Sequence, residues 1–157
     1  MNKKIVLAVL LVLPVLLFGC TNKMKEKEVI CKKDLKYQDN GITWINEVSL
    51  KYDVNDEVTN ATIKEFITVN SSISEERRAS FKDQVEKECT SELGSKFDSC
   101  TIETLQDQFT ITFSTNKLDV LNSAIASSDN QTLDTDSKKD GVTKYLVNNG
   151  YVCEEVK

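Results

Sequence analysis

The chain has 157 residues, of which 39% are hydrophobic and 29% charged, and its formal net charge is −5 at pH 7. An acidic chain without a dense run of lysine or arginine argues against a nucleic-acid partner. The chain contains no histidine. This excludes Ser-His-Asp and Cys-His catalysis, histidine general bases and every zinc site with a histidine ligand.

The first twenty residues have the pattern of a secretory signal. Lys3 and Lys4 precede an apolar run over residues 5–18, which ends at Gly19-Cys20. As a helix this run is about 21 Å long, well short of the roughly 30 Å hydrocarbon layer that a spanning segment must cross. A basic head, a short apolar core and a small residue at the end indicate a cleavable signal.

The ending Leu17-Phe18-Gly19-Cys20 resembles the lipobox of bacterial lipoproteins, in which the chain is cut before the cysteine and its sulfur carries diacylglycerol. The resemblance implies a lipoprotein signal peptide over residues 1–19 and lipidation of Cys20, with palmitate among the acyl chains. It also implies an extracytoplasmic protein anchored to the cell membrane of a bacterium. The alternative is an ordinary signal cut elsewhere, which leaves Cys20 as a free or bridged thiol.

Cleavage before Cys20 leaves 18 basic and 25 acidic residues, a net charge of −7. We therefore expect contact with the membrane through the lipid alone, because an acidic chain does not adsorb to anionic lipid. Residues 20–28 carry the lipidated cysteine and a charged, apolar-poor segment that we interpret as a flexible tether. Residues 29–157 have the size of one domain that buries a core of its own.

The first half of this domain predicts strands. Residues 29–31 form a short candidate strand, and residues 42–52 alternate with period two except at Ile45 and Asn46. Residues 58–69 are again rich in Thr, Ile, Val and Phe, and a turn signal at residues 55–57 separates the two runs. They predict a long antiparallel hairpin, with Trp44 packed in the core.

A helix follows the hairpin. Ser72 and Glu75 have the spacing of a capping box and predict a helix from about Ile73 to Cys89. Its apolar stripe repeats every four residues at Phe81, Val85 and Cys89.

The remaining elements alternate between strands and short helices. Residues 100–105 and 109–113 predict two strands, and a short helix follows Asn116. Residues 127–136 form a loop, Ser137 with Asp140 caps a last helix that Asn149-Gly150 ends, and residues 151–153 form a closing strand. Together they predict a single α+β domain: a curved antiparallel sheet of about four to six strands with two to three helices packed on one side.

The order of these elements, after a lipobox and a charged tether, resembles the YehR-like family of small bacterial lipoproteins of unknown function. The C-terminal residues carry the resemblance: Lys-Lys-Asp-Gly-Val-Thr at 138–143, Asn-Gly-Tyr at 149–151 and Glu-Val-Lys at 155–157. The resemblance implies the same fold and the same location at the cell membrane. The family has no catalytic motif that could be matched to residues of this chain.

The cysteines are the strongest chemical feature of the domain. Four remain after Cys20, and an even number in an exported domain predicts two disulfides in one of three connectivities. Proximity in sequence favours Cys89–Cys100, which leaves Cys31–Cys153 to tie the first strand to the last. The alternatives are a four-cysteine metal site, whose paired short spacings are missing, and buried free thiols.

Acidic residues cluster at two places in the chain, at Asp53/Asp56/Glu57 and at Asp134/Asp136/Asp140. Such groups suit paired carboxylates or a weak calcium site, but neither has the spacing of an EF-hand and acidic turns are usually just solvated. The chain has no Gly-rich phosphate loop, GxSxG motif or CxxC motif. We therefore expect neither a metal nor another cofactor.

These observations favour a non-enzymatic binding or interaction module of the cell envelope, with an unknown envelope protein or small ligand as its partner. A polar sheet face that exposes Thr43, Thr110 and Thr112 is the expected surface. One alternative is a hydrolase that uses paired carboxylates on envelope glycans. Another is a purely structural lipoprotein that holds an assembly in place.

Overall fold

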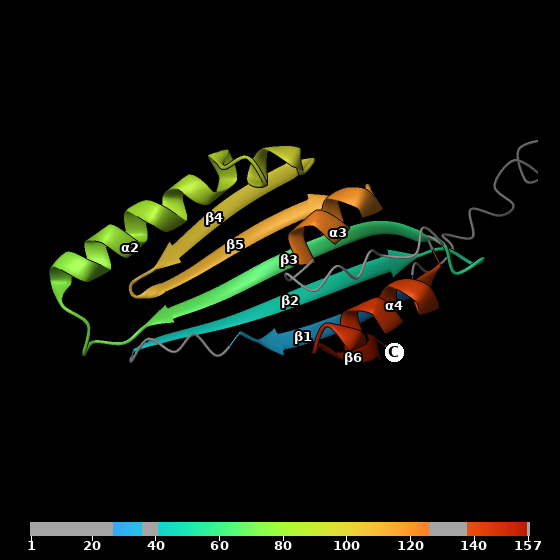
Figure 1. The fold of residues 1–157 in the computed structure, drawn as a ribbon, viewed down its shortest axis with the longest axis horizontal. Helices are drawn as coiled ribbons and strands as arrows, with labels where there is room; N and C mark the ends of the chain where they lie inside the picture. Colours follow the sequence, from blue (N-terminus) through green and yellow to red (C-terminus); the bar gives the residue numbers. More distant parts are fainter. Residues whose placement is uncertain (1–26, 36–40, 126–137, 157) are drawn as a thin grey trace, which may run out of the picture.

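The computed structural model describes residues 27–35, 41–125 and 138–156. They form one six-stranded antiparallel sheet (Figure 1). The strands are β1 (Lys27–Asp34), β2 (Ile42–Tyr52), β3 (Val58–Val69), β4 (Ser99–Leu105), β5 (Gln108–Thr115) and β6 (Val152–Val156). Their order across the sheet is β4-β5-β3-β2-β1-β6, so β4 and β6 are the two edge strands.

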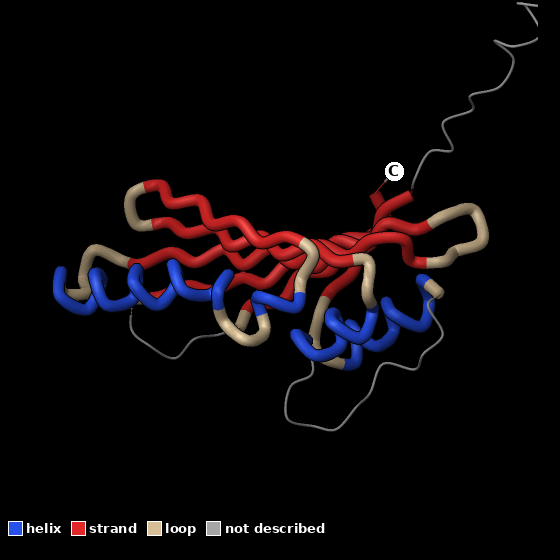
Figure 2. The backbone as a smooth tube through the Cα atoms, turned by 90° about the horizontal axis from the view of Figure 1, so that it is seen from above, coloured by secondary structure: helices blue, strands red, loops and turns tan. Residues whose placement is uncertain are grey.

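The helices of the described residues lie on one side of this sheet (Figure 2). They are α2 (Glu75–Lys87), α3 (Leu118–Ile125) and α4 (Lys139–Asn148), with two short 3-10 turns, η1 (Glu88–Thr90) and η2 (Gly94–Lys96), after α2. α2 lies toward one end of the sheet, and α3 and α4 lie toward the other end. The predicted α+β class, with a single domain and helices on one face, is confirmed.

β2 and β3 form the long hairpin predicted from the sequence. Their register runs from Ile42 opposite Val69 to Tyr52 opposite Val58, with an irregularity at Lys51. The strand alternation passes through residues 45 and 46 without a break. Asn46 is buried on the helix side, 8% exposed, and Ile45 is 37% exposed on the other side. What looked like a break in the pattern is a local inversion of polarity in a regular strand.

α2 begins two residues later than predicted, and its N-cap differs. The hydroxyl of Ser74, not of Ser72, accepts a hydrogen bond from the backbone N–H of Arg77 at 3.4 Å. Ser72 instead belongs to the preceding turn, where its own N–H donates to the side chain of Asn70. The predicted apolar stripe is confirmed, because Val85 is buried and Phe81 and Cys89 pack against the core.

α4 ends as the sequence predicts. Gly150 has φ +86°, the left-handed conformation that favours glycine, and the N–H of Tyr151 donates to the carbonyl of Leu146 at 3.1 Å. At its other end the N-cap is Lys138, which makes no side-chain cap bond. The cap expected at Ser137 lies outside the described residues.

The helix side of the sheet and the inner sides of the three helices form one core. Its largest fully buried aliphatic side chains are Leu50, Ile67, Ile111, Leu121 and Leu146. They come from three strands and two helices, so α3 and α4 pack on the sheet with the apolar surfaces that their sequences repeat every three to four residues.

β1 begins at Lys27, so two residues assigned to the tether belong to the sheet. Lys27 and Glu28 pair with Tyr52 and Lys51 of β2. The signal peptide, Cys20, the loop 127–136 and the carboxylates of Asp134 and Asp136 lie outside the described residues. Within the described ranges, none of the helices is both long enough and apolar enough to cross a membrane.

Candidate functional site

Both disulfides have the predicted pairing. Cys31–Cys153 joins β1 to β6 with its Cα atoms 3.9 Å apart, and Cys89–Cys100 joins η1 to β4 with its Cα atoms 5.4 Å apart. Each edge strand of the sheet is therefore covalently attached to a neighbouring element. Two such bridges are typical of proteins that fold outside the cytoplasm.

The sheet face opposite the helices, which we call the open face, is covered by no described helix (Figure 2). Thr43, Thr110 and Thr112 lie on this face, as predicted. At its centre Ile45 of β2 stands directly opposite Phe66 of β3, and each is 37% exposed. Of the side chains on this face, this exposed aromatic and aliphatic pair gains the most free energy when another apolar surface buries it.

Polar side chains on the same face bond to one another across the strands. Lys32 of β1 forms an ion pair with Glu47 of β2 at 3.0 Å. The hydroxyl of Ser49 donates to the carboxylate of Glu28 in the next strand. Farther across the sheet the hydroxyls of Thr62 and Ser114 are hydrogen-bonded at 3.3 Å. In these three pairs the polar side chains of neighbouring strands satisfy one another.

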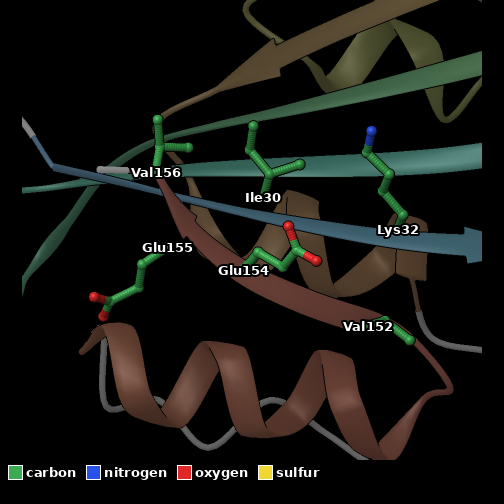
Figure 3. A pocket seen from close by; sticks show the side chains of 6 residues that line it. All are labelled: Ile30, Lys32, Val152, Glu154, Glu155 and Val156. Atoms are coloured by element: carbon green, nitrogen blue, oxygen red, sulfur yellow. The ribbon is translucent and has the colours of Figure 1, made fainter.

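A shallow hollow of about 360 Å³ lies where the open face meets the β6 edge (Figure 3). Ile30 and Lys32 of β1 and Val156 of β6 point to the open side, whereas Glu155 points toward α4. The carboxylate of Glu155 there accepts a hydrogen bond from the ammonium group of Lys139 at 2.7 Å. The other lining residues are Val152 and Glu154.

A buried polar cluster lies on the helix side of the two central strands. Glu65 of β3 stands opposite Asn46 of β2, and the phenol of Tyr151 donates to the side-chain oxygen of Asn46 at 3.2 Å. Burial, helped by the nearby charge of Glu88, raises the pKa of Glu65 to about 7, although a hydrogen bond from Trp44 opposes the shift. A carboxyl group with this pKa is largely protonated below neutral pH.

Two tyrosines complete the cluster. Burial, with the nearby charge of Glu65, raises the pKa of Tyr151 to about 12. The hydroxyl of Tyr145 on α4 is buried and has no hydrogen-bond partner in the described part of the chain. The sequence contained the signal for this cluster, because positions 46 and 65 are polar residues at core-facing positions of their strands. Of the acidic residues, the sequence singled out only Asp53/Asp56/Glu57 and Asp134/Asp136/Asp140, so Glu65 was missed.

The first acidic group belongs to a turn. The carboxylate of Asp53 accepts hydrogen bonds from the backbone N–H groups of Asn55 at 2.8 Å and Glu57 at 3.0 Å, and these bonds lower its pKa. The carboxylate therefore closes the connection between β2 and β3. Of the second acidic group only Asp140 is described; it is exposed beside Lys139. Nowhere in the described ranges do three or more potential ligand side chains group to hold a metal ion.

Two further hollows lie at the end of the sheet that α2 covers. One is lined by residues of β2, β3 and α2 around Phe81, and the other lies beside Gly41 and Asn70. Neither these two nor the hollow at β6 is lined by Glu65.

Comparisons with known proteins give no relative. No protein-family model matches the chain, and neither the curated proteins nor the solved structures contain a match.

Proposed function

We propose that this protein is a membrane-anchored extracytoplasmic lipoprotein and a non-enzymatic binding module of the cell envelope. Its partner is another envelope protein, which docks on the open face. The observation that carries the proposal is the pair Ile45 and Phe66, part-exposed at the centre of a sheet face that no described helix covers.

The composition of the open face supports a protein partner. Protein interfaces place aromatic and aliphatic side chains at the centre and polar side chains at the rim. Here the central pair is surrounded by threonine and serine hydroxyls and by the ion pair of Lys32 with Glu47. The two disulfides attach both edge strands, so the surface is held in shape before a partner binds.

The remaining parts of the proposal rest on the sequence. Lipidation at Cys20 places the domain outside the cytoplasmic membrane at the end of a short tether. Membership of the YehR-like family rests on the C-terminal residues 138–143, 149–151 and 155–157.

A second candidate function, the carboxylate-dependent hydrolase of envelope glycans, is favoured by one observation, the raised pKa of Glu65. A general acid with a pKa near 7 suits neutral solution. The reaction also needs a second carboxyl group roughly 5–9.5 Å away and a cleft that admits the sugar. The described hollows do not supply that cleft at Glu65. Glycan hydrolysis that Glu65→Gln abolished in a folded protein would favour this candidate over the binding module.

Binding at the open face is tested by photo-crosslinking from the two faces of the sheet in the native host. A partner that docks as proposed is captured from the open face and not from α2.

Lipidation of Cys20 predicts that a single substitution at this residue releases the protein from the membrane. Cys20→Ala removes the sulfur that carries the lipid, so the full chain loses labelling by a palmitate analogue and is no longer retained by the membrane. The measurement is cell fractionation with metabolic labelling, and Cys20→Ser serves as a second variant without the thiol. An unlabelled, uncut Cys20→Ala protein that still fractionates with the membrane would show that residues 5–18 anchor the chain themselves.

A further inference from the structure

Among the described residues, the outward-pointing backbone groups of the β6 edge have no strand partner. β6 is the last strand in the sheet order, and no described segment pairs with its outer side. Cys31 and Cys153 stand directly opposite each other with a Cα separation of 3.9 Å, nearer the roughly 4.5 Å of a non-hydrogen-bonded antiparallel pair than the roughly 5.5 Å of a hydrogen-bonded one. In that register the N–H and C=O groups of Cys153 and Glu155 point away from β1. They form a template for one further strand.

The side chains of β6 on the open side alternate apolar, acidic, apolar. Val152 is 71% exposed, Val156 is 49% exposed, and Glu154 lies exposed between them. All three line the hollow of Figure 3 together with Ile30 of β1. Val152 and Val156 therefore offer apolar contact on either side of a negative charge.

The charge of Glu154 is the one that the edge leaves uncompensated. Lys32, its neighbour in the hollow, already pairs with Glu47 at 3.0 Å, and Glu155 pairs with Lys139 at 2.7 Å. Glu154 has no ion-pair partner within the described ranges. A cation brought beside it would gain an electrostatic partner without breaking an existing pair.

A second copy of this chain is a poor occupant of the edge. Two β6 strands paired symmetrically and antiparallel about their midpoint place Glu154 opposite Glu154. Like charges directly opposite each other destabilise a strand pair, and the net charge of −7 on each mature chain adds to the repulsion. The charge of the edge thus selects a basic partner.

We propose that β6 accepts an extended basic segment of a partner protein as a seventh strand of the sheet. The segment reads apolar-x-Lys/Arg-x-apolar, so that its cation lies beside Glu154 and its two apolar side chains lie beside Val152 and Val156. Main-chain hydrogen bonds to Cys153 and Glu155 supply affinity, and the three side chains supply specificity. The inference deepens the proposed function, on which it rests, by naming the chemistry of one partner segment.

Fluorescence anisotropy with designed peptides tests the proposal. The probe is a labelled nonapeptide, Ser-Thr-Val-Thr-Lys-Thr-Val-Thr-Ser, added to the full chain in detergent micelles. The matched control peptide has glutamate in place of the lysine. We expect the lysine peptide to bind at least tenfold more tightly than the control, and Glu154→Lys to reverse that preference.

Two substitutions at Glu155 separate the backbone contact from the charges. Glu155→Pro removes the outward N–H, which an edge strand can lose without breaking its bonds to β1. Glu155→Ala loses the same ion pair with Lys139 but keeps the N–H. We expect the proline variant to lose peptide binding and the alanine variant to retain it.

Three results would overturn the strand-addition proposal: no binding of the lysine peptide at millimolar concentration, equal binding of both peptides, or unchanged binding by Glu155→Pro. If any of these occurs while the open face still captures a partner in the cell, the proposed function stands and only the site at β6 is wrong.

Discussion

Replacing Cys31 and Cys153 together by alanine lowers the free energy of unfolding by about 5 kcal/mol, whereas the same change at Cys89 and Cys100 lowers it by about 3 kcal/mol. The difference follows from the sequence separations of the two pairs, 122 and 11 residues. In the chain-entropy model a bridge destabilises the unfolded state more when it closes a longer loop.

A loss of 5 kcal/mol is comparable to the whole stability of many domains of this size. Urea denaturation of the two double variants, compared with the oxidised wild type, measures both losses. Alanine is a suitable replacement because Cys31 is fully buried among apolar side chains, where a serine hydroxyl would lack a partner. If the Cys31/Cys153 variant loses no more stability than the Cys89/Cys100 variant, loop closure is not what this bridge contributes.

Stability also falls as the pH rises from about 4.5 to about 7, because of Glu65. Its pKa is about 7 in the folded protein against a reference value of 4.5, so over this range the folded state holds a proton that the unfolded state has released. Above pH 7 the folded state must hold a buried carboxylate. By linkage the full cost is about 3 kcal/mol.

Glu65→Gln removes this cost, since the amide carries no charge and still has an oxygen to accept the bond from Trp44. We expect the variant to be more stable than wild type at pH 8 by up to about 3 kcal/mol and nearly equal to it at pH 4.5. Denaturant titrations at the two pH values measure the effect. Asp53, Asp98 and Glu155 have lowered pKa values, so their contributions are lost only at acid pH, below this window.

Glu88→Gln is the matched control, because it removes the neighbouring charge and leaves Glu65 in place. It lowers the pKa of Glu65 and so reduces the pH dependence without abolishing it. Equal stability of wild type and Glu65→Gln at pH 8 would mean that water reaches the carboxylate in the folded protein.

The sequence predicted the class of fold because its strands and helices repeat with clear periods. Residues 42–52 and 58–69 alternate over long runs, and the turn residues between them leave little choice of topology. The disulfide pairing followed from one short and one long separation. The helix start at Ser74 was missed because the capping-box spacing occurs at Ser72, which has Glu75 three positions on, whereas the residue three positions after Ser74 is Arg77.

The candidate surfaces were predicted less well. The threonines of the open face were expected, but the apolar centre at Ile45 and Phe66 was not, because Ile45 and Asn46 were interpreted as a break in the strand. At these two positions the apolar residue, Ile45, lies on the open face and the polar residue, Asn46, lies on the core side. Ile45 is therefore part of the exposed apolar pair, and Asn46 is part of the buried polar cluster. The free edge at β6 depends on the strand order, which no local pattern in a five-residue strand determines.

The central claim is that a partner protein docks on the open face, and photo-crosslinking in the native host tests it most directly. A photoreactive phenylalanine analogue is placed at Thr43 on the open face or, in the control, at exposed Lys82 on α2. We expect a discrete protein adduct from position 43, no such adduct from position 82, and loss of the adduct when Phe66→Thr is added to a protein that still folds. Equal adducts from both positions, or none from position 43, would contradict the claim.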